Sequence, residues 1–563
     1  MSASTDDQFY RRTFALGIIV LGVAAVTVGR LVYWVLKPAP WPPPPPLNEE
    51  EVFLPERGNI YDCNGYLLSV AHTFSDIEAA PNIVTDTEMM ASRLAPLLNE
   101  PREKLLAQLD PTTSWARLKR RVKWNEAKEI LSWGLQGLYI KTWPGRIYPH
   151  NSLAAGVLGF VTDKGQAFYG VEREYDELLA GKPGHREVVT DVLGSLSYEV
   201  QVARHGADLF LTLDRNVQYI VEEALAKAVE VNAAKRGAAI VMDPQTGAIL
   251  AMALYPTYDP NTRDVDDFKI FVNWAISERY EPGSVFKIVT IGSALDAGVI
   301  STTSTYYDAG EIMVGGEVIR NSDDAAHGET SIPDLLAYSL NVGAAHVSTK
   351  LGAFKFYEYV RRFGFNELTG VDLADEVAGQ VRFPGDREWH ESDLATNSFG
   401  QGLAITPLQM LCAVSAVANH GLLMRPHIVD RIVDGEMVTN ISPKVIRQVI
   451  SPEAAAQVTE MLVYAVDTVL TTAAVPGYKV AGKSGTSEVP TLTGYDPEET
   501  IASFAGYVPA DDPQLAILVV LDRPQKEHWG LTAAAPAFRE IAQRLLTLLA
   551  VPPDSGRTAV RVH

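Results

Sequence analysis

The sequence contains very little cysteine, only Cys63 and Cys412 in 563 residues. The two lie far apart and neither belongs to a C-x-x-C motif, which excludes a disulfide framework and a zinc knuckle. The eleven histidines are also scattered, without an H-E-x-x-H motif or a paired spacing. We therefore expect no metal site and no cofactor.

Basic charge is also in short supply. The chain has 48 lysines and arginines against 69 aspartates and glutamates, which gives a formal net charge of -21. Such a chain repels polyphosphate and gains little from counterion release, so we expect no nucleic-acid partner. Hydrophobic residues make up 47% and charged residues 21%, as in globular proteins, and the length suits several domains.

One long apolar run is present near the start, from Thr13 to Leu36, with the single charge Arg30 and no proline. As a helix it spans ~36 Å, enough to cross a hydrocarbon core of about 30 Å. The run is longer than the apolar part of a signal peptide, and no A-x-A cleavage site follows it. The sequence thus predicts one uncleaved transmembrane helix. Its flanking positive charges are nearly balanced, so they do not fix its orientation.

Proline dominates the next segment, where seven of the nine residues from Pro38 to Pro46 are proline. This composition favours polyproline II and a semi-rigid spacer of ~28 Å beside the membrane. A ligand for an SH3-like groove has the same composition and is the alternative.

Strand and helix signals both follow the linker, which indicates a mixed domain from about 51 to 204 and a second domain after it. Asn64-Gly65 separates two short apolar runs, as in a tight hairpin whose two turn residues both have positive φ. Around Asp214 a strand pattern passes into a helix pattern. Further predicted features are helices near Met89 to Leu106, Trp124 to Leu138 and Thr532 to Leu549, and two strands joined by a turn at Pro244 to Gly247.

Ser284 and Lys287 form an S-x-x-K motif at the predicted start of a helix. Positions i and i+3 share a helical face, so the lysine amine can reach the serine hydroxyl. Burial near the positive end of the helix lowers the pKa of a lysine, as a general base requires. Alone the motif is weak, because a chain of this length contains about one S-x-x-K by chance.

Two further motifs follow in the chain order that the S-x-x-K, S-x-N, K-[TS]-G set requires: Ser339-x-Asn341, then Lys483-Ser484-Gly485-Thr486. Ser339 can relay a proton to a leaving amine, and the Asn341 amide can hold a substrate backbone. The run from Tyr478 to Thr486 predicts a strand along an extended peptide, with the Ser484 and Thr486 hydroxyls and the Lys483 charge facing a carboxylate.

With these motifs the chain resembles a class B penicillin-binding protein, a peptidoglycan D,D-transpeptidase, over nearly its whole length. The resemblance includes the membrane anchor. It is carried further by RGNIYDCNG at 57–65, RIYPHNSLAAGVLGFV at 146–161, GADLFLTLDRNVQ at 206–218, GAILAMALYPTYDPN at 247–261, SFGQG at 398–402 followed by TPLQM, and ASFAGYVP at 502–509. Cys63 departs from the family, which usually has arginine there, and so does the polyproline segment.

The resemblance implies Ser284 as the acylated nucleophile and the backbone N–H groups of Ser284 and Thr486 as the oxyanion hole. Lys287, Ser339, Asn341 and Lys483 complete the catalytic set, and Ser484, Gly485 and Thr486 bind substrate. It also implies an α+β multidomain fold, with a β-rich pedestal before a transpeptidase domain of the β-lactamase/D,D-peptidase type, an antiparallel sheet flanked by helices. The expected segments are a cytoplasmic tail 1–12, an anchor 13–36, a linker 37–50, the pedestal (dimerisation-type) domain 51–204, the transpeptidase domain 205–549 and a tail 550–563.

The implied substrates are peptidoglycan stem peptides, with β-lactams as inhibitors. The family places the N-terminus in the cytoplasm and the catalytic domain outside the bacterial membrane. No segment resembles a glycosyltransferase, so we expect a SEDS-family glycan polymerase and other division proteins as partners. SFGQG and the stretch from Asn321 to Gly328 favour the division branch. The alternatives are an elongation-type transpeptidase, a serine β-lactamase or carboxypeptidase, and a catalytically silent β-lactam-binding scaffold.

Overall fold

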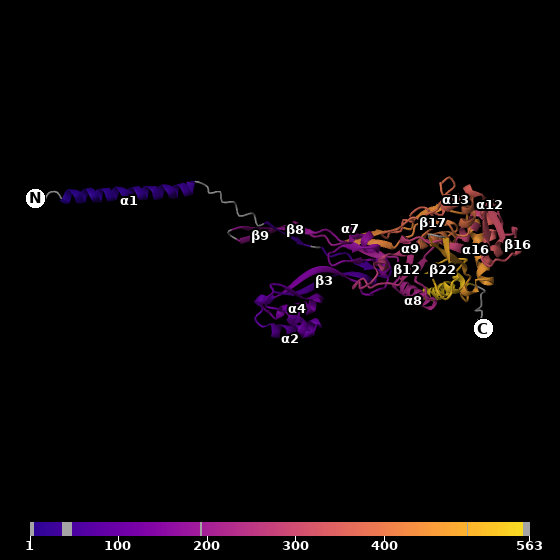
Figure 1. Cartoon of the computed structure of the whole chain (residues 1–563), viewed down its shortest axis with the longest axis horizontal. Helices are drawn as coiled ribbons and strands as arrows, with labels where there is room; N and C mark the ends of the chain where they lie inside the picture. Colours follow the sequence, from indigo (N-terminus) through magenta and orange to yellow (C-terminus); the bar gives the residue numbers. More distant parts are fainter. Residues whose placement is uncertain (1–4, 37–47, 54, 192–193, 492–493, 555–563) are drawn as a thin grey trace. The chain divides into compact units, whose positions relative to one another are not determined.

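The computed structural model describes residues 5–36, 48–53, 55–191, 194–491 and 494–554 (Figure 1). The chain forms two compact units, Met1–Pro55 with Lys182–Arg204, and Glu56–Gly181 with His205–His563. Residues 37–47 of the predicted linker and 555–563 of the predicted tail lie outside the described residues.

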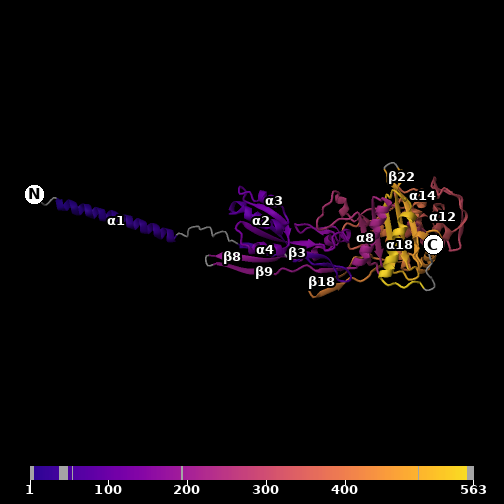
Figure 2. The same cartoon turned by 90° about the horizontal axis from the view of Figure 1, so that it is seen from below.

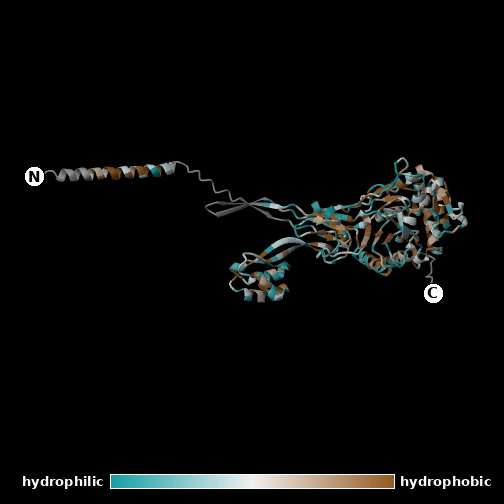
Figure 3. Ribbon diagram, in the orientation of Figure 1, coloured by the Kyte–Doolittle hydropathy of each residue, from teal (hydrophilic) through white to brown (hydrophobic). Residues whose placement is uncertain are grey.

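The first unit contains the predicted membrane helix. Helix α1 (Thr5–Leu36) holds an apolar stretch, Thr13–Tyr33, that is long enough to cross a membrane and has no buried residues (Figure 3). The same unit has an antiparallel sheet of β1 (Asn48–Phe53), β8 (Gly184–Asp191) and β9 (Gly194–Gln201). Because lipid, unlike water, imposes no cost on exposed apolar side chains, α1 is suited to be a membrane anchor.

The second unit begins with a seven-stranded sheet whose strands come from distant parts of the chain. In order these are β19 (Met437–Asn440), β18 (Val429–Asp434), β10 (Asp208–Leu211), β2 (Ile60–Tyr61), β3 (Leu67–Ala79) and β4 (Ala116–Val122), with β5 (Leu138–Ile147) also paired to β3. Strand β10 is parallel to β2 and antiparallel to β18. Residues 56–181 of this unit are part of the predicted pedestal, 51–204.

The pedestal helices correct two predicted boundaries. The single helix expected near residues 89–106 is two, α2 (Thr87–Leu98) and α3 (Arg102–Gln108), because Asn99 is left-handed at φ 49° and Pro101 begins the next helix. Helix α4 (Trp124–Ser132) stops before the expected end at Leu138, which already belongs to β5. These helices pack a small core against β3, β4 and β5.

The predicted hairpin after Tyr61 exists, but its turn differs. Gly65 has a φ of 84°, whereas Asn64 is not in the left-handed region. The carboxylate of Asp62 accepts hydrogen bonds from the backbone N–H groups of Asn64 and Tyr66, so a side chain stabilises the turn and one left-handed residue suffices.

The catalytic part is built on a five-stranded antiparallel sheet with β21 at one edge. Its order is β12 (Ile249–Tyr255), β11 (Arg236–Met242), β23 (Leu515–Asp522), β22 (Gly494–Val508) and β21 (Ala481–Thr491). The turn predicted at Pro244 to Gly247 does join two strands. Helices α8 (Arg215–Asn232) and α18 (Ala535–Leu548) lie side by side and pack on this sheet (Figure 2). The predicted passage from strand to helix around Asp214 is confirmed, and Asp214 caps α8. The expected helix 532–549 is split into α17 (Gly530–Ala533) and α18.

The catalytic part also contains a buried helix, α10 (Lys287–Asp296). Helices nearest the motifs are α11 (Ile332–Tyr338), α12 (Asn341–Leu351), α14 (Glu391–Ser398), α15 (Pro407–Ala418) and α16 (Pro452–Thr468). Helices α9 (Trp274–Ser277) and α13 (Ala353–Arg362), the hairpin β14 (Glu311–Val314)/β15 (Glu317–Arg320) and the two-stranded antiparallel sheets β13 (Thr305–Asp308)/β16 (Gly328–Ser331) and β17 (Leu422–Met424)/β20 (Val445–Gln448) complete the catalytic part. The pedestal also contains α5 (Ala155–Leu158), α6 (Gly170–Glu174), α7 (Asp176–Leu179) and the hairpin β6 (Phe160–Val161)/β7 (Ala167–Phe168). The fold is therefore α+β, with an antiparallel sheet flanked by helices, as the sequence predicts.

Candidate active site

Ser284 lies on a 3-10 turn, Gly283–Phe286, that leads into α10. Gly283 has a φ of 58°, which an L side chain rarely adopts. A Cβ atom on Gly283 would lie 2.6 Å from the carbonyl oxygen of Thr486 on β21. Glycine at this position therefore lets the serine turn approach the edge strand closely.

Lys287 is one turn after Ser284 and has no solvent exposure. Its Nζ atom lies 3.0 Å from Ser284 Oγ, 2.8 Å from Asn341 Oδ1 and 2.6 Å from the backbone oxygen of Ser339. Burial lowers the pKa of Lys287 well below its ordinary value, and the charge of Lys483 lowers it further. A neutral amine at this distance can accept the serine proton.

Ser339 and Asn341 come from the junction between α11 and α12. Ser339 ends α11 in the left-handed region at φ 64°, and its Oγ lies 3.3 Å from Lys287 Nζ. Asn341 starts α12, accepts from Lys287 and donates through Nδ2 to the backbone oxygen of Arg320 at 3.2 Å. The amide thus orients the lysine. That the Asn341 amide also holds a substrate backbone stays a prediction.

The K-S-G-T motif lies on β21, which pairs only with β22 among the described residues. Lys483 is fully buried, and burial lowers its pKa to about 7. Its Nζ donates to the backbone oxygen of Ser484 at 2.9 Å. Ser484 and Thr486 are half-buried, whereas Gly485 between them is buried. This alternation puts the two hydroxyls on one face of an edge strand, where an extended peptide can add.

Thr486 also contacts α17. Its Oγ accepts a hydrogen bond of 3.0 Å from the backbone N–H of Gly530. The hydroxyl proton of Thr486 is then free to donate to a ligand carboxylate. The Lys287 amine thus contacts Ser284, Ser339 and Asn341. Gly283 lies against the backbone of Thr486.

Sequence reasoning missed Glu281, three residues before the serine. Its buried carboxylate accepts hydrogen bonds of 3.1 Å from the N–H of Gly402 and from the Tyr495 hydroxyl. Its backbone oxygen accepts from Ser487 Oγ at 2.7 Å. Burial raises the pKa of Glu281 to about 7. Glu281 therefore connects the serine turn to β21, β22 and the loop after α14. The acidic residue in the segment E-P-G-S is the sequence signal that could have indicated this role.

Gly400 was noted only as part of the S-F-G-Q-G resemblance. Its carbonyl accepts a hydrogen bond of 3.1 Å from the N–H of Gly283, and a Cβ on Gly400 would collide with the Gly283 backbone. Close backbone approach therefore explains glycine at both positions. Within the described residues, no group of three or more His, Cys, Asp or Glu side chains is placed to hold a metal ion.

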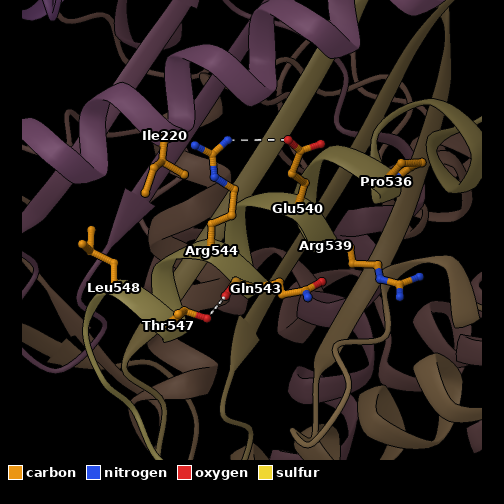
Figure 4. Close-up of a pocket in the computed structure, with 8 residues that line it drawn as sticks. All are labelled: Ile220, Pro536, Arg539, Glu540, Gln543, Arg544, Thr547 and Leu548. Carbon is orange, nitrogen blue, oxygen red and sulfur yellow. Dashed lines mark hydrogen bonds and ion pairs between the residues drawn. The ribbon is translucent and has the colours of Figure 1, made fainter. Parts of the chain in front are cut away.

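A cavity of about 710 Å³ lies elsewhere, between α8 and α18 (Figure 4). It is lined by Ile220, Pro536, Arg539, Glu540, Gln543, Arg544, Thr547 and Leu548. None of these belongs to the three motifs. Arg544 pairs with Glu223 at 2.7 Å and lies 3.6 Å from Glu540, so these charges compensate each other.

Comparison with known proteins agrees with this geometry. Residues 237–543 match the family described as Penicillin binding protein transpeptidase domain, and residues 53–211 match the Penicillin-binding Protein dimerisation domain. Stage V sporulation protein D of Bacillus subtilis is 33% identical over 90% of this chain and 80% of its own length. Peptidoglycan D,D-transpeptidase FtsI of Escherichia coli is 29% identical, covering 89% of this chain and 85% of the relative.

Solved structures show the same likeness. A peptidoglycan synthetase from Bifidobacterium adolescentis superposes with a TM-score of 0.73 at 27% identity, covering 90% of this chain and 98% of that one. Penicillin binding protein 3 of Mycobacterium tuberculosis, complexed with aztreonam, gives 0.71 at 28% identity, covering 91% and 100%. The chain belongs to the penicillin-binding protein transpeptidase family, and its dimerisation domain followed by a transpeptidase domain makes it a class B member.

Proposed function

We propose that this chain crosslinks peptidoglycan as a serine D,D-transpeptidase, with Ser284 as the nucleophile. The observation that carries the proposal is the 3.0 Å contact between Ser284 Oγ and the buried amine of Lys287. The likeness to proteins named peptidoglycan D,D-transpeptidase supports the choice of substrate.

In the first half-reaction, Ser284 Oγ attacks the carbonyl carbon of the penultimate D-alanine and its proton passes to Lys287. The backbone N–H groups of Ser284 and Thr486 stabilise the oxyanion. The C–N bond then breaks, and the terminal D-alanine leaves as an amine after receiving a proton through Ser339. Lys483, Ser484 and Thr486 bind the substrate carboxylate, with Gly485 allowing the strand to lie close to the serine turn.

In the second half-reaction, the amine of a neighbouring stem peptide attacks the acyl-enzyme. It loses a proton, forms the new amide and releases Ser284 as a hydroxyl. A β-lactam enters the same first step: Ser284 opens the ring and the acyl group stays attached to its leaving nitrogen. The leaving group therefore cannot diffuse away, which favours a long-lived adduct.

Orientation, segment limits and partners follow as further parts of the proposal. The substrate polymer lies outside the membrane, so the N-terminus is cytoplasmic and residues after the linker are extracytoplasmic. The family matches at 53–211 and 237–543 support a pedestal over 51–204 and a transpeptidase domain over 205–549. Because the chain crosslinks strands made by another enzyme, its partner is a SEDS-type polymerase, and the likeness to FtsI supports a role in division.

Labelling with a fluorescent penicillin tests the nucleophile. The wild-type protein and a Ser132→Ala control, an exposed serine on α4, are expected to retain covalent label, while Ser284→Ala is expected to lose it although it stays folded by thermal melting. Persistent label on a folded Ser284→Ala protein would contradict the proposal.

A further inference from the structure

The pedestal carries a cationic cleft that the catalytic proposal does not use. Its volume is about 760 Å³. The charged side chains that line it are Arg117, Arg120, Lys141, Lys164 and Arg263, against the two carboxylates of Asp76 and Asp163. This surplus of positive charge occurs in a chain whose formal net charge is -21. The cleft is therefore a local exception in an acidic protein and attracts anions.

A buried carboxylate organises the cleft from within. The side chain of Asp76 is 6% exposed and accepts a hydrogen bond of 2.9 Å from the indole N–H of Trp143. Its other oxygen lies 3.5 Å from Arg117 Nε and 3.7 Å from Arg120 Nε. Asp76 thus fixes one aromatic ring and two guanidinium groups, whose side chains remain 39% and 49% exposed.

The second carboxylate of the cleft, Asp163, also contacts two arginines. Asp163 pairs with Arg120 at 2.7 Å and lies 3.6 Å from Arg263. Lys141 and Lys164 are exposed, and the ammonium group of neither has a hydrogen-bond or ion-pair partner within the described residues. The two carboxylates therefore hold the arginines in place and leave the two ammonium groups available to a ligand.

The strand beside the cleft has an unusual backbone. Arg121 on β4 is in the left-handed region at φ 55°, and its N–H donates to Asp76 at 3.2 Å. Its guanidinium packs 4.8 Å from the Phe74 ring centre. This conformation is rarely adopted by a residue with a long side chain, and such positions cluster at ligand sites. The left-handed conformation directs the Arg121 N–H at Asp76, whose carboxylate also accepts from Trp143.

We propose that this cleft binds the carboxylates of uncrosslinked stem peptides on a glycan strand, at a site separate from Ser284. The inference rests on the proposed function for the identity of the polymer. Three features select this ligand. Lysine and arginine donors suit carboxylates, the Trp143 and Phe168 rings give apolar faces for sugars, and the volume suits one repeat unit better than a folded partner.

Binding of soluble glycan strands with uncrosslinked pentapeptide stems tests this site. The full-length protein is used in detergent after acylation with benzylpenicillin, so that the catalytic site is occupied. We expect saturable binding that weakens at high salt. Amidation of the stem carboxylates on the same strands should weaken it about tenfold or more, because the charged acceptors are removed.

The double variant Lys141→Glu/Lys164→Glu should weaken binding by at least about tenfold, whereas Lys128→Glu on the exposed face of α4 should leave it unchanged. Penicillin acylation rates should be equal in all three proteins. Unchanged binding in the double variant, or equal binding of amidated strands, would overturn the proposal. Equally tight binding of polyglutamate would also overturn it, because the cleft would then not select the polymer.

The two proposals fail in different measurements. Absence of acylation at Ser284 would remove the catalytic function, and glycan binding can still be measured on the unacylated protein. Normal acylation with no effect of the lysine substitutions on glycan binding would remove only the second site.

Discussion

Lys287 Nζ lies 3.0 Å from Ser284 Oγ and 2.8 Å from Asn341 Oδ1, and the lysine side chain has no solvent exposure. Among the described residues, no carboxylate forms a hydrogen bond with this amine. Burial without a counter-charge, next to the second buried lysine Lys483, favours the neutral amine. This relationship makes Lys287 a general base for the serine and leads to the first prediction.

Lys287→Arg should reduce acylation by at least about 100-fold while preserving the positive charge. Arginine has a pKa above about 12 and cannot release its proton in a protein, so it cannot act as the base. Acylation rates from pH 6 to 9 measure the effect, with Lys128→Arg as an exposed control. Near-wild-type rates in a folded Lys287→Arg protein would show that the lysine supplies only charge.

Gly283→Ala should abolish most acylation because its Cβ would lie 2.6 Å from the Thr486 carbonyl oxygen. Gly298 is the matched control: its φ of 68° resembles the 58° of Gly283, but no atom lies within 4 Å of its Cβ position. Both alanine variants should lose about 1 kcal/mol or more of stability from the backbone conformation. Only Gly283→Ala should lose acylation, and equal rates in both variants would contradict the close-contact argument.

Thr486→Val should lower the acylation efficiency of carboxylate-bearing β-lactams roughly 10 to 150-fold. A hydrogen bond to a charged group contributes ~1.5 to 3 kcal/mol, and valine cannot donate one. Thr486→Ser keeps the hydroxyl and the contact with the Gly530 N–H, so it should restore most of the rate. A second-order acylation rate that is the same for valine and serine would show that the hydroxyl does not face the ligand carboxylate.

Glu281 should make stability depend on pH. Burial raises its pKa from 4.5 to about 7, so the folded protein binds a proton that the unfolded chain releases. Its stability contribution therefore falls as pH rises from about 4.5 to 7 and is constant above that range. Glu281→Gln, neutral throughout, should gain stability relative to wild type by on the order of 2 kcal/mol between pH 5 and 8. Urea unfolding at several pH values measures this difference. A free-energy difference between the two proteins that does not change with pH would refute the titration of Glu281.

The sequence predicted the local parts of this site well because they depend on short spacings. The i, i+3 relation places Lys287 beside Ser284, and alternation on β21 puts Ser484 and Thr486 on one face. It did not predict that Glu281 contacts Gly402 and Tyr495, since these partners lie 121 and 214 residues away. Contacts of this kind depend on tertiary packing, which a motif does not encode.

The fold shows the same division. The passage from a strand into a helix around Asp214 was predicted from neighbouring residues, and the structure confirms it with β10 and α8. The long helix expected through residues 89–106 was wrong because apolar periodicity outweighed Asn99 and Pro101 in the prediction. The pairing of β10 with β2 and β18 joins segments more than 140 residues apart, and strand patterns alone do not select partners over that distance.

Peptide mapping of the β-lactam adduct tests the central claim most directly. The wild-type protein is treated with benzylpenicillin, measured as intact mass and then digested for mass spectrometry. The account predicts one covalent adduct per chain, located on Ser284, because its Oγ lies 3.0 Å from the buried Lys287 amine, nearer than the Ser339 Oγ at 3.3 Å. An adduct on Ser339 or Ser484 with Ser284 unmodified would contradict it.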